Sequence, residues 1–168
     1  MAEALLRTTR LSKTYRSGDS LVRAVADLSV RIEQGEFVAI QGRSGSGKST
    51  VMHLLGLLDR PDAGEYLFLG KPVEGLSDDM RAAIRNRDIG FVFQQPALLP
   101  RATAIDNVAL PLAYAGLRST DRRRRAANAL DRVGLAHRTE HWPQQLSGGE
   151  QQRVGPHQEA CTQPGNSA

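Results

Sequence analysis

A glycine-rich stretch in the N-terminal half has the residue types and spacing of a phosphate-binding loop. It reads Gly42-Arg43-Ser44-Gly45-Ser46-Gly47-Lys48-Ser49 and matches the pattern G-x-x-x-x-G-K-S. The glycines let successive backbone N–H groups point at phosphate oxygens, and the N-terminus of a following helix adds partial positive charge. Lys48 can reach the terminal phosphates of ATP, and Ser49 can offer its hydroxyl to the accompanying Mg²⁺. A plain glycine-rich turn needs neither Lys48-Ser49 nor three glycines in this register.

A second candidate anion site lies near the C-terminus. Leu146-Ser147-Gly148-Gly149-Glu150 precedes a short helical segment, so Ser147 and the N–H groups of two glycines form a helix start suited to phosphate. Taken alone, the segment is equally consistent with an ordinary glycine-rich helix cap. The phosphate-binding loop in the same chain favours the functional interpretation, because one chain then carries two phosphate cradles.

The segments around these sites predict the elements that position them. Alternating apolar residues indicate a half-buried strand over 24–32, and short apolar runs indicate strands buried on both faces over 37–40 and 89–93. Helical spacing predicts helices over 48–58, 78–85 and 120–133, and Thr103 with Asp106 resembles a capping box that opens a helix toward Tyr114. Gly134 is placed to end the third of these helices.

Composition and charge exclude several classes of protein. The 168 residues suffice for one domain, and 40% hydrophobic with 24% charged residues is typical of a globular chain. The net charge of +4 is concentrated in the run 122–125, which favours a solvated helix face over a phosphate or lipid contact, and no nucleic-acid partner is expected. No apolar run has the length of a membrane helix or a signal peptide, so we expect a cytoplasmic location. Cys161 is the only cysteine, which excludes a disulfide within the chain.

With both motifs in place, the sequence resembles the ABC transporter ATPases, whose signature motif reads like Leu146–Glu150 followed by Gln151-Gln152-Arg153. The stretches SGSGKST, LLDRPDAGEY, IGFVFQQPALLP and IDNVALPLAYAG look most like the branch that serves lipoprotein release and macrolide or peptide export. The resemblance implies an incomplete α/β P-loop NTPase of ABC type, with a partial parallel core sheet, an antiparallel β subdomain and a helical subdomain. It predicts a nucleotide core with the β subdomain over 1–94, the helical subdomain and signature over 95–153, and a disordered tail unlike the family over 154–168. A P-loop kinase or GTPase would leave LSGGE unexplained.

The resemblance also implies roles for individual residues. Tyr15 looks like the aromatic that stacks on adenine, although a strand residue packing on the sheet is the alternative. The implied nucleotide-binding set is Tyr15, Gly42, Arg43, Ser44, Gly45, Ser46, Gly47, Lys48, Ser49 and Thr50. Gln94 resembles the glutamine that meets Mg²⁺ together with Ser49, and Gln95 is the competing assignment.

In this family two ATPase subunits sandwich two ATP molecules. Ser147, Gly148, Gly149 and Glu150 would therefore serve the ATP held by the second copy of a homodimer. Residues 95–117 would dock on a membrane permease, which would place the chain peripherally on the inner face of the cell membrane. The expected cofactors are ATP and Mg²⁺.

The sequence after Val154 departs from the family pattern. Hydrolysis in this family uses an Asp-Glu pair at the end of an apolar strand and a later histidine, whereas this chain continues GPHQEACTQPGNSA. That stretch contains no Leu, Ile, Val or Phe, so no buried strand is expected, and Gly155-Pro156 predicts an early end to the signature helix. We therefore assign no catalytic residue, expect very weak turnover, and expect a truncation or frameshift in the gene near Val154. A non-catalytic ATP-binding fragment is the alternative function.

Overall fold

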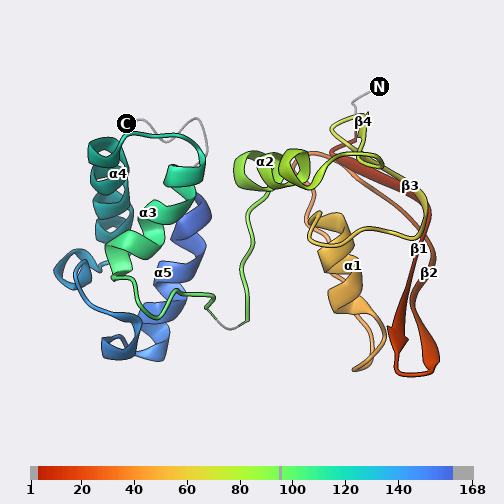
Figure 1. The fold of residues 1–168 in the computed structure, drawn as a ribbon, viewed down its shortest axis with the longest axis horizontal. Helices are drawn as coiled ribbons and strands as arrows, with labels where there is room; N and C mark the ends of the chain where they lie inside the picture. The colour runs from red at the N-terminus through yellow and green to blue at the C-terminus, as the bar shows by residue number, and fades with distance from the viewer. Residues whose placement is uncertain (1–3, 95, 161–168) are drawn as a thin grey trace. The chain divides into compact units, whose positions relative to one another are not determined.

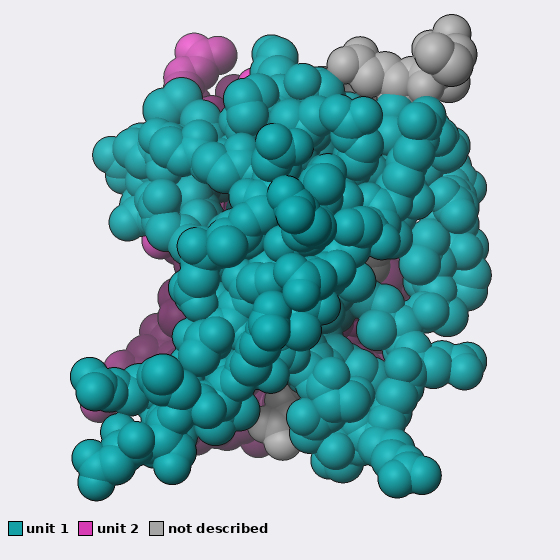
Figure 2. Space-filling view, turned by 90° about the vertical axis from the view of Figure 1, so that its right-hand side faces the viewer, with its two compact units in different colours: residues 1–82 teal, residues 83–168 magenta. Residues whose placement is uncertain are grey.

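The computed structural model describes residues 4–94 and 96–160, with only the backbone given for 156–160. The chain divides into two compact units, Met1–Ala82 and Ala83–Ala168, which Figure 2 shows in different colours. Each unit has its own secondary structure (Figure 1). The strands are β1 (Leu6–Ser17), β2 (Ser20–Ile32), β3 (Ala63–Phe68) and β4 (Lys71–Pro72), and the helices are α1 (Lys48–Leu55), α2 (Asp78–Asp88), α3 (Ala104–Tyr114), α4 (Ser119–Arg132), α5 (Gly148–Ala160), η1 (Ala136–Arg138) and η2 (Pro143–Gln145).

The first unit is built on an antiparallel sheet in the order β2-β1-β3-β4. β1 and β2 form a long hairpin whose register runs from Leu6 opposite Ile32 to Ser17 opposite Ser20. The predicted strand is confirmed within β2, where side chains over 28–32 alternate between half-buried and exposed as expected. Leu11 of β1 and Leu54 of α1 are both buried in the apolar core. Burial of these side chains holds α1 beside the sheet.

The two strands predicted at 37–40 and 89–93 are not formed, and this part of the prediction was wrong. Among the described residues the only sheet is the antiparallel one, so the expected partial parallel sheet is not present there. Phe37 is 93% exposed and Val92 is 76% exposed, although both positions were predicted to be buried. An apolar run forms a strand only when neighbouring strands satisfy its backbone groups, and no described strand pairs with either run.

The second unit is a helical cluster in which α3, α4 and α5 share an apolar core. Val108, Leu130 and Val154 are fully buried, one from each helix. Thr103 caps α3 by accepting a hydrogen bond from the backbone N–H of Asp106 at 3.3 Å, which confirms the predicted helix start. Gly134 follows α4 with φ +72°, the left-handed conformation expected of a residue that ends a helix.

Three helices end more than one residue away from the predicted position. α1 ends at Leu55 rather than at Leu58, because Leu57 adopts a left-handed conformation with φ +58°. α2 continues past Arg85 to Asp88. α5 continues through Gly155 and Pro156 to Ala160, whereas the sequence predicted an end at this pair. Proline removes one backbone donor but has a helix-compatible φ, and buried Val154 anchors the preceding turns, so the helix survives it. Residues 161–168 of the predicted tail lie outside the described residues.

Candidate functional site

The phosphate-binding loop joins the irregular segment after β2 to the start of α1. Gly47 is the N-cap residue of α1 and adopts the left-handed conformation, with φ 86° and ψ 5°, and it makes no side-chain cap hydrogen bond. Within the loop the N–H of Ser46 donates to the carbonyl of Arg43 at 3.2 Å, which closes a tight turn. The loop therefore presents an open helix N-terminus, and backbone N–H groups with positive partial charge face away from the helix.

Lys48 lies folded over this loop. Its Nζ atom donates to the carbonyl oxygens of Gly42 at 2.8 Å and Arg43 at 2.7 Å. The ammonium group thus sits at the mouth of the loop, where it can exchange these carbonyls for the oxygens of a phosphate. Most loop residues and Ser49 are exposed, while Gly47, Lys48 and Thr50 are half-buried.

Close packing against the backbone requires glycine at position 47 of the loop. A Cβ atom on Gly47 would lie 2.1 Å from the carbonyl oxygen of Ala24 in β2, whereas one on Gly42 would lie 2.6 Å from the Oγ of Ser46, a side-chain atom that can rotate away. Gly45 also has a positive φ of 79°, but a Cβ atom there would meet nothing within 4 Å. The hairpin strand β2 thus holds the end of the loop at Gly47, which explains how the sheet positions the cradle.

Tyr15 lies on the β1–β2 hairpin and is 37% exposed. Its hydroxyl donates to the Oδ2 atom of Asp59 at 2.6 Å. The hydrogen bond to Asp59 and burial raise the pKa of Tyr15, while a hydrogen bond with Thr50 on α1 acts in the opposite direction. The structure therefore brings Tyr15 beside the helix that begins at the phosphate-binding loop.

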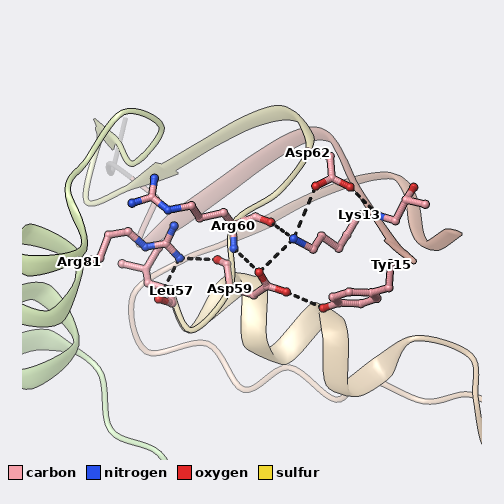
Figure 3. A network of polar contacts seen from close by, with 8 residues as sticks. Lys13, Tyr15, Leu57, Asp59, Arg60, Asp62 and Arg81 are labelled. Atoms are coloured by element: carbon pink, nitrogen blue, oxygen red, sulfur yellow. Dashed lines mark hydrogen bonds and ion pairs between the residues drawn. The ribbon is translucent and has the colours of Figure 1, made fainter. Parts of the chain in front are cut away.

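Figure 3 shows the polar network around Asp59, for which sequence reasoning assigned no role. Lys13 Nζ lies 3.0 Å from Asp59 Oδ1 and 3.5 Å from Asp62 Oδ1. Burial acts to raise the pKa of Asp59, but hydrogen bonds from Tyr15 and Lys13 hold it below its ordinary value. The stretch LLDRPDAGEY contains both carboxylates, and the only sequence signal was its likeness to the family.

The signature segment, Leu146–Glu150, forms a reciprocal capping box. The backbone N–H of Ser147 donates to Glu150 Oε2 at 2.7 Å, and the backbone N–H of Glu150 donates to Ser147 Oγ at 3.3 Å. Leu146 is buried in the core of the second unit, while Ser147, Gly148 and Gly149 are exposed. The box thus engages Ser147 and Glu150 with each other and presents the two glycines at the surface of the helix start.

The pKa of Glu150 predicts a pH dependence of stability. The backbone N–H and the side chain of Ser147, together with Arg138, hold the pKa of Glu150 below its ordinary value. Because the folded-state pKa is lower than the unfolded-state pKa, ionised Glu150 stabilises the fold above the unfolded-state value, and this contribution is lost as pH falls through the folded-state value. The difference in Tm between the unchanged chain and Glu150→Gln should shrink as pH falls from about 6 to about 3. Thermal unfolding measures it, with exposed Glu65→Gln as the control, and a pH-independent difference would contradict the expectation.

The two candidate glutamines for the metal ion, Gln94 and Gln95, lie outside the first unit. Gln94 is exposed and lies at a bend in the second unit, whereas the phosphate-binding loop belongs to the first. Gln95 lies outside the described residues.

The described residues contain no group of three or more His, Cys, Asp or Glu side chains placed to hold a metal ion. Across the same residues, no helix has the length and apolar composition needed to cross a membrane.

Comparison with known proteins identifies the family of the chain. The family described as ABC transporter matches residues 25–164. The chain is 56% identical over 150 residues to the macrolide export ATP-binding/permease protein MacB of Chlorobaculum tepidum, covering 89% of this chain and 23% of that protein. It is 51% identical over 142 residues to an uncharacterized ABC transporter ATP-binding protein of Thermotoga maritima, covering 84% of this chain and 61% of that protein. The chain thus spans about a quarter of the length of its MacB relatives.

A solved structure has the same fold. The ATP-binding cassette MJ0796, in a dimeric post-hydrolysis state bound to ADP and Pi, matches with a TM-score of 0.85 and 39% identity, covering 94% of this chain and 69% of that one. A glycine-rich cradle on α1, a capped signature on α5 and these matches lead to one conclusion: the chain belongs to the ABC transporter family.

Proposed function

We propose that the first unit binds ATP with Mg²⁺. The observation that carries this proposal is the left-handed Gly47 cap, which leaves the α1 N-terminus open beneath the ammonium group of Lys48. Residues 42–50 would hold the phosphates, Tyr15 would stack on the base, and Ser49 with Gln94 would meet the metal ion. The bound Mg²⁺ would supply charge neutralisation between the terminal phosphates. The ADP and Pi reported for MJ0796, and the exposed loop of this chain, support the assignment.

We further propose that Ser147, Gly148 and Gly149 serve the ATP of a second copy. The two dimeric MJ0796 structures support a paired arrangement of ATPase subunits. The printed names of the MacB relatives, which join ATP binding to a permease, support a membrane partner for the longer protein. The resulting function is coupling of ATP binding and hydrolysis to export or lipoprotein release, with the domain peripheral on the inner face of the membrane.

The family is one of ATPases, but we infer that the 168-residue polypeptide itself turns ATP over very slowly. The sequence after the signature contains no Asp-Glu pair following an apolar strand. Absence of a general base typically costs roughly 100- to 10,000-fold in rate. The second candidate function, a non-catalytic ATP-binding fragment, rests on this observation.

Binding and turnover measured together test both candidates. Isothermal titration with ATP and Mg²⁺ is expected to give saturable binding, and phosphate release by the same sample should remain at background. Binding with rapid phosphate release would exclude the non-catalytic fragment, whereas absence of any ATP binding would overturn the proposal as a whole.

Replacing Ser147 tests whether the signature segment contacts the ATP of a second copy and not the ATP of its own chain. Ser147→Ala should leave ATP affinity of the separate chain within about twofold, because its own ATP lies on the phosphate-binding loop. The same change should weaken ATP-dependent self-association by about tenfold, since a cap and a phosphate contact are both lost. Sedimentation velocity with and without ATP measures this, and Ser119→Ala, at the start of α4, is the matched control. Equal self-association of Ser147→Ala and the unchanged chain would contradict a role across the dimer.

A further inference from the structure

We propose that Asp59 is a positioning residue that fixes the ring of Tyr15 as the platform for the base of the nucleotide. This inference rests on the proposed nucleotide binding, because a base platform matters only when the phosphates lie on the neighbouring loop. It adds a function for Asp59, which lies in the segment directly after α1. This segment belongs to neither the phosphate-binding loop nor the signature.

The inference rests on the hydrogen bond between the side chains of Tyr15 and Asp59. The Tyr15 hydroxyl donates to Asp59 Oδ2 at 2.6 Å, a short hydrogen bond to a charged acceptor (Figure 3). Tyr15 is more than a third exposed and stands near the end of the β1–β2 hairpin, opposite Val22. A ring in this position would otherwise rotate about its two side-chain bonds. Anchoring the hydroxyl restricts that rotation. Lys13 Nζ lies over the ring, 5.3 Å from its centroid, so a base would stack on the opposite face.

Asp59 is itself held by several groups. Its Oδ1 atom accepts from Lys13 Nζ at 3.0 Å and from the backbone N–H of Arg60 at 2.7 Å. Lys13 also donates to the carbonyl of Arg60 at 2.6 Å. Because these contacts use Oδ1, the second carboxylate oxygen is left to receive the Tyr15 hydroxyl.

The backbone of the same segment is fixed from the opposite side by Arg81. This arginine is 4% exposed, and its guanidinium donates to the carbonyl of Leu57 at 2.9 Å and to the carbonyl of Asp59. A buried guanidinium with carbonyl partners is costly to displace. Asp59 therefore has a defined position even though its side chain is half-buried.

The placement of Asp59 links the base platform to the phosphate cradle. α1 begins at Lys48 in the loop and ends at Leu55, four residues before Asp59. A short helix is a rigid spacer, so the carboxylate that holds Tyr15 and the loop that would hold the phosphates are joined through one element. Fixing the ring before the nucleotide arrives removes an ordering cost from binding.

Comparison of ATP with inorganic triphosphate tests the inference, because only ATP carries a base. Asp59→Ala is expected to weaken ATP binding about threefold to tenfold and to leave triphosphate binding within about twofold. Asp62→Ala is the matched control, since Asp62 also approaches Lys13 but does not bond to Tyr15. Asp59→Asn keeps the shape of the side chain but replaces one acceptor oxygen with an NH2 donor, so it should recover only part of the ATP affinity.

A double-mutant cycle distinguishes positioning from general stabilisation. Tyr15→Phe keeps the ring but removes the hydroxyl, so Asp59→Ala should cause no further loss of ATP affinity in that background. Equal loss for ATP and triphosphate, or an unchanged effect of Asp59→Ala in Tyr15→Phe, would overturn the inference. If triphosphate binds normally and Asp59→Ala leaves ATP affinity unaltered, only this inference fails. If the unchanged chain binds no triphosphate, the proposed function fails and the inference fails with it.

Discussion

Replacing Lys48 with alanine is expected to lower the affinity of the chain for ATP about 10- to 100-fold, since charge-assisted hydrogen bonds to phosphate are lost. The Nζ atom now bonds to two loop carbonyls, at Gly42 and Arg43, and would transfer to phosphate when the nucleotide binds. The loss should be similar for ATP and for inorganic triphosphate, because Lys48 acts on phosphate and not on the base. Isothermal titration at one fixed salt concentration measures both affinities.

The chain supplies a matched control for this experiment. Lys71 on β4 is exposed, and Lys71→Ala removes the same charge from the same unit at a site outside the loop. Its ATP affinity should stay within about twofold of the unchanged chain. Equal affinities of Lys48→Ala and Lys71→Ala would show that the loop does not hold phosphate.

Gly47→Ala should have the second large effect, this time on both stability and binding. The new Cβ atom would lie 2.1 Å from the carbonyl of Ala24, and the residue would keep a φ of 86° that alanine rarely adopts. We expect a loss of about 2 to 4 kcal/mol in the free energy of unfolding, because a backbone clash adds to the conformational strain. The displaced loop should also lose measurable ATP affinity. Urea unfolding followed by circular dichroism gives the stability.

Gly45→Ala is the control that separates strain from the clash. Gly45 has a φ of 79°, close to that of Gly47, but a Cβ atom there meets nothing within 4 Å. Only the conformational cost of about 1 to 2 kcal/mol is expected. If both variants were destabilised equally, close packing of Gly47 against β2 would not be what positions the loop.

The loop over 42–49 and the signature segment differ in the range of the contacts that hold them in place. The phosphate-binding loop depends on a long-range contact, since Ala24 in the hairpin restricts Gly47. The signature depends on local bonds, because Ser147 and Glu150 cap each other three residues apart. Loss of hairpin structure should therefore affect the first cradle more than the second.

Local sequence was sufficient wherever the determining interactions lie close along the chain. The loop from Gly42 to Ser49, the Thr103 cap, the Gly134 helix end and the signature were all recognisable from residue types at fixed spacing. Strand β2 was recognisable because its alternation reflects a sheet with one buried face. The family followed from these motifs, and the match over residues 25–164 confirmed it.

Tertiary structure decided the features that depend on distant partners. Residues 37–40 and 89–93 have strand-like composition, but a strand forms only beside another strand, and among the described residues neither run has one. The pairing of Tyr15 with Asp59 joins residues 44 positions apart, which no local pattern encodes. Motif spacing thus led to the family, whereas the neighbours of Gly47 and Tyr15 became known only once the hairpin, α1 and the segment after it were placed together.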